Sequence, residues 1–144
     1  MMKTNIITTV IAFAVFAACK DKTDKTSNPK PKYSVRQQAL IGKDWRLASI
    51  KFQGIDFTQA LPECFKDNIV HHFTDEKSGY TDEGTTKCDQ LDSQRVSLSW
   101  KLIANESKMV IKQAGYDDTF EIIRVGNKEL EYLYEGQSVV LRHP

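Results

Sequence analysis

Three cysteines carry the most distinctive chemistry in this sequence of 144 residues. Cys19 directly follows an apolar leader, whereas Cys64 and Cys88 lie further along and enclose a loop of about 25 residues. In a protein that has left the cytoplasm, such a pair most often forms a disulfide, which would stabilise the fold by about 3.5 kcal/mol. The alternative is a metal site that uses both thiolates and a histidine, but the paired spacing of zinc ligands is missing. We predict a Cys64–Cys88 disulfide and no metal.

Two adjacent histidines, His71 and His72, lie in a segment predicted to be a strand. Successive side chains of a strand point to opposite faces, so the two imidazoles cannot share one ion or one substrate. His71 is in phase with Ile69 and Phe73, which places it on the apolar face. There it could line a cavity or form a hydrogen-bonded part of the core.

Three pairs of carboxylates lie in or beside predicted turns, at Asp75–Glu76, Asp82–Glu83 and Asp117–Asp118. Acid–base catalysis needs two carboxylates at a set separation around a desolvated cleft, whereas turn pairs usually face water. The sequence also contains no serine-nucleophile, phosphate-loop or dinucleotide motif. We therefore expect neither enzymatic activity nor a cofactor. A hydrolase would require His71 to meet a carboxylate within about 3 Å.

The first 18 residues resemble the signal peptide of bacterial lipoproteins. The apolar run from Ile6 to Ala18 has 13 residues, fewer than the roughly 20 that span a bilayer. The residues before Cys19 are Phe16, Ala17 and Ala18, as in a lipobox except that Phe16 replaces the usual Leu, Val or Ile. The resemblance implies cleavage before Cys19 and acylation of its thiol and new amine, palmitate being one such chain. The alternative is an ordinary secretory signal.

Residues 20–33 contain five lysines, two aspartates and two prolines but no aliphatic residue, so they cannot form a core. We interpret residues 19–33 as a flexible tether with a reach of roughly 20 Å. The formal net charge is +1, and it falls to zero without Lys3, so no strong field would attract nucleic acid. We expect a monomer held in the cell envelope by its lipid, at the outer membrane, with its folded domain in residues 34–144.

The folded domain is predicted to be almost entirely β-strand. Ser34 and Gln37 have the spacing of a capping box, so a short helix is expected between Ser34 and Gly42. Beyond it, apolar residues alternate with polar ones, most regularly from Val96 to Leu102. Eight strands are predicted, at residues 45–52, 68–73, 79–85, 96–102, 108–113, 119–125, 129–135 and 138–142.

The later strands are separated by turn segments of two to five residues, at 104–107, 114–118, 126–127 and 135–136. Such short connections force sequence neighbours to pair as an antiparallel meander. An open sheet of eight strands would leave exposed edges, and closure removes them. We therefore predict an all-β, eight-stranded antiparallel up-and-down barrel with a short N-terminal helix.

The segment LeuIleGlyLysAspTrpArgLeu at 40–47 resembles the bacterial lipocalin-like lipoproteins, in which a short helix leads through Gly and Trp into the first strand. The resemblance continues through 64–68, Phe73, 79–88 and 96–102. Lipocalins proper have Gly-x-Trp, whereas Gly42 and Trp45 are one residue further apart. The resemblance implies a lipocalin-like barrel with an interior cavity, and members of the bacterial family mostly have no assigned activity.

The interior of an eight-stranded barrel is either filled by side chains or holds one small ligand. Aromatic residues that alternation places inside are the candidate ligand contacts, together with one histidine: His71, Phe73, Trp100, Tyr132 and Tyr134. We predict that the barrel binds a small apolar or amphipathic molecule. The alternative is an inhibitor or accessory subunit with a filled barrel, which would contact another envelope protein through its outer surface or the 54–67 loop. That alternative requires an exposed apolar patch.

Overall fold

A computed structural model describes residues 32–144 of the chain. The predicted signal peptide, Cys19 and most of the predicted tether lie outside the described residues. Among those that are described, no helix has the length and apolar character needed to cross a membrane.

The described residues begin with a short α-helix, α1 (Val35–Leu40), which is capped as the sequence predicts. The Ser34 hydroxyl accepts a hydrogen bond from the Gln37 backbone N–H at 3.1 Å, and the Gln37 side chain accepts one from the Ser34 N–H at 3.0 Å. These two bonds satisfy N–H groups that the first helical turn leaves without partners. At the other end, the Trp45 indole N–H donates to the Leu40 carbonyl at 3.0 Å, which fixes the helix against the barrel.

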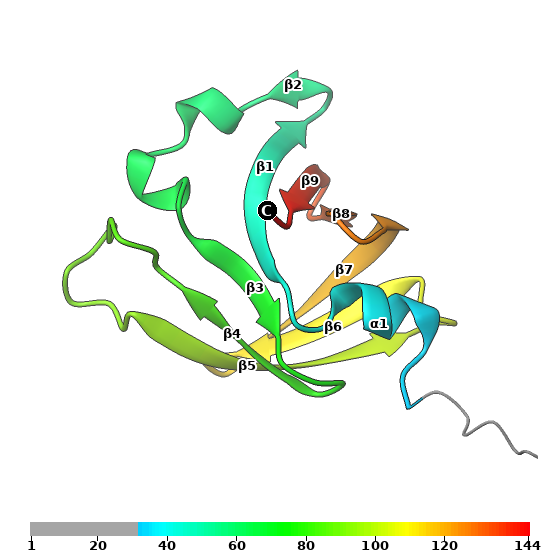
Figure 1. Ribbon diagram of the computed structural model, residues 1–144. Helices are drawn as coiled ribbons and strands as arrows, with labels where there is room; N and C mark the ends of the chain where they lie inside the picture. The colour runs from blue at the N-terminus through cyan, green and yellow to red at the C-terminus, as the bar shows by residue number, and fades with distance from the viewer. Residues whose placement is uncertain (1–31) are drawn as a thin grey trace, which may run out of the picture. The chain divides into compact units, whose positions relative to one another are not determined.

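Strands make up most of the rest, and Figure 1 shows them curling around one interior. Their bounds are β1 (Asp44–Phe52), β2 (Ile55–Asp56), β3 (Ile69–Phe73), β4 (Ser78–Asp82), β5 (Arg95–Ile103), β6 (Lys108–Gln113), β7 (Tyr116–Val125), β8 (Glu129–Tyr134) and β9 (Gln137–Arg142). Each of β3 to β9 pairs antiparallel with its sequence neighbour, and β1 pairs with both β3 and β9, which closes the barrel. The predicted eight-stranded antiparallel barrel is confirmed, with β2 as a two-residue addition to β1.

Two strand boundaries differ from the prediction by three residues, and several others by one. Strand β4 ends at Asp82, three residues early, because Thr85 and Thr86 donate backbone hydrogen bonds to the Asp67 carboxylate instead of continuing the ladder. Strand β7 begins at Tyr116, so Asp117 and Asp118 lie in a strand and not in a turn. The turn before β7 needs only two residues, since Gly115 adopts a positive φ of 86°.

The barrel wall is incomplete on one side of β1. This edge pairs with β3 only from Asp44 to Arg46, and with β2 only at Lys51 and Phe52. Between these points it meets a loop: the Phe57 N–H donates to the Ile50 carbonyl at 2.9 Å, and the Ile50 N–H donates to the Thr58 hydroxyl at 3.0 Å. The loop includes two short 3-10 turns, η1 (Thr58–Ala60) and η2 (Glu63–Phe65). A loop therefore covers this side where a strand would otherwise stand (Figure 1).

The covering loop is joined to the long β4–β5 connection. Cys64 and Cys88 form a disulfide with Cα atoms 5.2 Å apart, which confirms the predicted pair and contradicts the alternative metal site, because bonded sulfurs are not thiolate ligands. Next to it, the Asp67 carboxylate accepts hydrogen bonds from the Thr85 backbone and hydroxyl. Gly84 allows this approach, since a Cβ there would lie 2.6 Å from the Asp67 carboxyl group.

The interior is filled with apolar side chains at the end that α1 covers. Leu40, Trp45 and Phe73 are fully buried there, and the Phe73 ring lies 4.4 Å from the Trp100 ring. Toward the incomplete wall the packing changes, and a buried histidine, His71, takes the place of an aliphatic residue.

Candidate functional site

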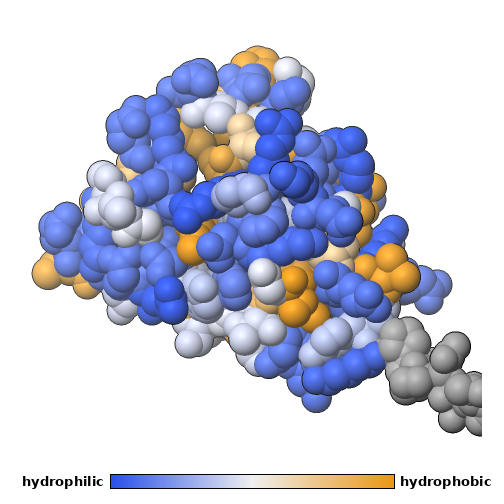
Figure 2. Space-filling model, in the orientation of Figure 1, coloured by the Kyte–Doolittle hydropathy of each residue, from blue (hydrophilic) through white to orange (hydrophobic). Residues whose placement is uncertain are grey.

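A pocket of about 360 Å³ lies inside the incomplete wall. It is built from Leu47 on β1, from the end of the covering loop, and from residues at the ends of β3, β4 and β6. The complete lining is Leu47, Phe65, Asn68, Ile69, Val70, His71, Thr81, Asp82, Glu83 and Gln113. A second hollow of about 260 Å³, beneath η1, shares Leu47 with it. In Figure 2 a hollow with apolar surface inside it is visible between β1 and the η1–η2 segment.

His71 is a buried polar residue in the lining of this pocket. Its side chain is only 6% exposed, and neither ring nitrogen has a hydrogen-bond partner in the described part of the chain. Three aromatic rings surround it: Phe73 at 5.6 Å, Phe120 at 5.9 Å and Tyr132 at 6.1 Å between centroids. Because burial disfavours the charged imidazolium, the pKa of His71 is lowered to about 4. At neutral pH the ring is therefore uncharged and carries one donor and one acceptor nitrogen, both buried.

The other polar groups near His71 are mostly satisfied. Gln113 donates to the Thr81 hydroxyl at 2.7 Å across β4 and β6. The Asn68 amide, oriented to suit its neighbours, donates to the backbone carbonyls of Cys64 and Glu83 at 2.7 and 2.5 Å. An unpaired buried polar group costs about 1–3 kcal/mol, so His71 is the exception that calls for an explanation.

Comparison with solved structures identifies the architecture. A lipocalin-like protein from Bacteroides uniformis ATCC 8492 superposes with a TM-score of 0.54 and 16% sequence identity, over 72% of this chain and 97% of its own. An uncharacterized protein from Bacteroides eggerthii DSM 20697 gives a TM-score of 0.52 and 16% identity, over 73% of this chain and 99% of its own. This chain has a lipocalin-like fold. No known family and no curated protein matches its sequence.

The lipocalin-like barrel places the five predicted ligand contacts at different depths. His71 lines the pocket, while Phe73 and Tyr132 lie behind it and contact its ring. Burial raises the pKa of Tyr132, so its hydroxyl stays protonated. Trp100 is buried but does not line this pocket, and it donates its indole N–H to the Asp75 carbonyl at 2.7 Å. Tyr134 donates to the Asp118 carboxylate at 2.8 Å, so the partner that its hydroxyl needed is a side chain of this chain.

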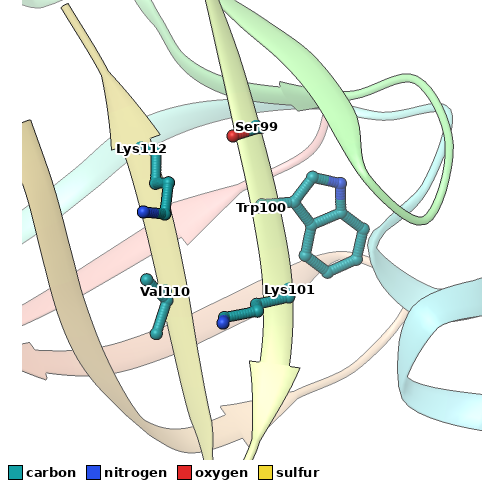
Figure 3. Close-up of a pocket in the computed structure, with 5 residues that line it drawn as sticks. All are labelled: Ser99, Trp100, Lys101, Val110 and Lys112. Carbon is teal, nitrogen blue, oxygen red and sulfur yellow. The ribbon is translucent and has the colours of Figure 1, made fainter. Parts of the chain in front are cut away.

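A smaller hollow beside Trp100 lies on the outer surface of the barrel. Figure 3 shows the Trp100 ring on one side of β5 and the side chain of Lys101 on the other. The hollow measures about 80 Å³ and is lined by Ser99, Trp100, Lys101, Val110 and Lys112. Ligand pockets usually exceed about 300 Å³, so this hollow is too small for a drug-sized molecule.

His72 points away from the pocket of the lipocalin-like barrel. Its Nδ1 lies 2.6 Å from a carboxylate oxygen of Asp44, and its ring stacks on Tyr80 at 4.5 Å. The histidine–carboxylate contact that a hydrolase would need at His71 is thus found at His72, on the opposite face of β3. Tyr80 is covered in turn by the Arg95 guanidinium at 3.9 Å, which gives this cluster a structural explanation.

Several pocket residues were not among the sequence-predicted contacts. Thr81 and Gln113 are inward-facing polar residues, which alternation along β4 and β6 could have identified. Leu47 and Glu83 could not be found this way, because their place in the pocket depends on where β1 leaves β3 and where β4 ends. Phe65 belongs to a loop without periodicity.

Proposed function

We propose that this protein is a membrane-anchored, non-enzymatic lipocalin-like binder that holds a small apolar or amphipathic molecule in the pocket at His71. The observation that carries the proposal is a buried imidazole with two unpaired nitrogens at the inner wall of a 360 Å³ pocket. The volume lies within the usual range for small-molecule sites. A ligand with one hydrogen-bonding group and an apolar body would satisfy His71 and cover the neighbouring Ile69 and Val70.

The first experiment is native mass spectrometry of the protein purified from its own membrane. We expect a mass excess that disappears on denaturation and identifies a bound small molecule. Recombinant protein, stripped of ligand, should then bind 1-decanol, an uncharged probe with one hydroxyl. Absence of both the mass excess and decanol binding would contradict the proposal.

The second experiment separates His71 from its neighbour. The variant His71→Phe keeps an aromatic ring but removes both nitrogens, so decanol should bind about tenfold more weakly. The same variant should be more stable to heat, since the unpaired polar atoms are gone. His72→Phe is the matched control on the outer face and should bind decanol as the wild type does. Equal binding by His71→Phe and wild type would exclude His71 from the site.

Membrane attachment through Cys19 is part of the same proposal. The sequence of the leader supports it, and Cys19 lies outside the described residues. In cells fed labelled palmitate, the wild type should incorporate label and partition into detergent, whereas Cys19→Ala should do neither. A mature protein that keeps its first 18 residues would contradict the anchor.

A second candidate function, contact with an envelope protein, is supported by one observation. Four large apolar residues are exposed around β2 and the covering loop: Phe52, Ile55, Phe57 and Phe65 at 41%, 61%, 41% and 45%. Substituting Ile55 and Phe57 by Ser should leave decanol binding unchanged but would abolish capture of such a partner in crosslinking from intact cells.

A further inference from the structure

The charge around the pocket restricts the kind of molecule that it can hold. Resting on the proposed function, we propose that the ligand is a lipophilic amine, whose ammonium group pairs with Glu83 and whose apolar body lies against Leu47, Ile69 and Val70. We expect a fatty acid with an alkyl chain of the same length to bind more weakly than the amine.

Glu83 carries the carboxylate that can pair with a cationic ligand. It lines the pocket and is half-buried, and in residues 32–144 no Lys, Arg or His side chain forms an ion pair with it. Its neighbour Asp82 also lines the pocket, but its carboxylate is already bound by Arg95 at 3.0 Å and by Gln94 at 2.8 Å. These hydrogen bonds, that of Gln94 first, lower the pKa of Asp82.

Two cationic residues, Arg46 and Lys66, are sequence neighbours of lining residues but do not themselves line the pocket. Lys66 lines the second hollow and forms an ion pair with Glu63. The Arg46 guanidinium donates to the Asp67 backbone carbonyl. The ten residues that line the main pocket include no Lys or Arg. A carboxylate ligand would therefore meet a like charge at Glu83 and find no cation on the pocket wall.

His71, on the strand next to β4, reinforces this preference. Its burial keeps the imidazole neutral, so it cannot serve as the counter-ion of an anionic head group. It can accept one hydrogen bond from an ammonium group or exchange one with a hydroxyl. An amine is thus the head group whose charge complements Glu83. An alcohol can hydrogen-bond to Glu83 or His71 but brings no charge, and a carboxylate is repelled by Glu83.

Three probes of equal chain length test the proposal: decylamine, 1-decanol and sodium decanoate. Their volume suits a pocket that corresponds to about a dozen water molecules. At pH 7.5 and low salt, isothermal titration should give the order decylamine, decanol, decanoate, with at least a tenfold difference between the first and the last. Raising the salt concentration should reduce the advantage of the amine over the alcohol, because ions screen a half-buried pair.

The variant Glu83→Gln should remove the preference for decylamine while binding decanol within about twofold of wild type, and the decanol result also shows that the variant is folded. Glu121→Gln is the matched control, since Glu121 is exposed on β7 and points outward. If no probe binds to the wild type, the proposed function itself fails. If decanol binds but decanoate binds as tightly as decylamine, or Glu83→Gln keeps the amine preference, the pocket stands and the charge selection is wrong.

Discussion

The end of the barrel that α1 covers, here called the closed end, differs from the incomplete side in the partners of its polar groups. At the α1 end, Trp45, Phe73 and Trp100 pack against each other, and both indole N–H groups donate to backbone carbonyls. On the incomplete side, His71 has no partner and Glu83 has no counter-ion within the described residues. Within residues 32–144, buried polar atoms without a partner also occur at Asp67 beside the covering loop and at His143, whose ring lies 6.3 Å from that of Trp45. His71 differs from these in that neither of its two polar atoms has a partner in this part of the chain and it lines a pocket.

The largest expected difference is in unfolding free energy, between a truncation at the closed end and one on the incomplete side. Phe73→Ala removes a fully buried ring between His71 and Trp100 and should cost about 3–5 kcal/mol of unfolding free energy. Leu47 lines the pocket and is only half-buried. Leu47→Ala should therefore lower the unfolding free energy clearly less than Phe73→Ala, while weakening decanol binding. Urea denaturation of both variants checks this difference. Equal losses would mean that the incomplete side is as tightly packed as the closed end.

Removal of the disulfide should have the next largest effect on stability, and this effect should be confined to the incomplete side. The double variant Cys64→Ser with Cys88→Ser opens a loop of about 25 residues and should cost about 3.5 kcal/mol. Because the bridge joins the covering loop to the β4–β5 connection, hydrogen exchange should rise in residues 57–67 and 83–94 but not in α1. Uniform loss of protection would contradict this local role.

His71 should give the incomplete side a pH dependence. Its pKa is about 4 in the folded protein and 6.5 in the unfolded chain, so between these values only the unfolded chain binds the proton. The contribution of His71 to stability is thus complete above pH 6.5 and is lost as the pH falls toward 4, by up to about 3 kcal/mol. Urea denaturation of the wild type and His71→Phe at pH 7.5 and 4.5 isolates this effect. A wild-type pH dependence that persists in His71→Phe would have another origin.

The smallest expected effect is at the closed end. Ser34→Ala removes the side-chain cap of α1 and should cost about 1 kcal/mol. Ligand binding should be unchanged, because α1 lies away from the pocket lining. A loss of decanol affinity in this variant would show that the two ends are coupled.

The closed end was predictable from the sequence and the incomplete side was not. Alternation identified Trp45, Phe73 and Trp100 as inward-facing, and the Ser34–Gln37 spacing identified the cap, because both signals are local. The pocket arises from long-range events: β1 leaves β3 after Arg46, and Asp67 ends β4 by binding Thr85. Neither event produces a periodic pattern of apolar residues in the sequence. The sequence predicted His71, Trp100 and Tyr134 together as ligand contacts, whereas the structure places only His71 in the lining of the main pocket and pairs Tyr134 with Asp118.

The most direct test of the account is the ¹⁵N NMR signal of the histidine rings during a titration with decylamine. We predict that both ring nitrogens of His71 shift saturably with a single dissociation constant, while those of His72, held by Asp44 on the outer face, do not move. Binding that shifts His72 or outer-face residues and leaves His71 unchanged would contradict a ligand site inside the barrel.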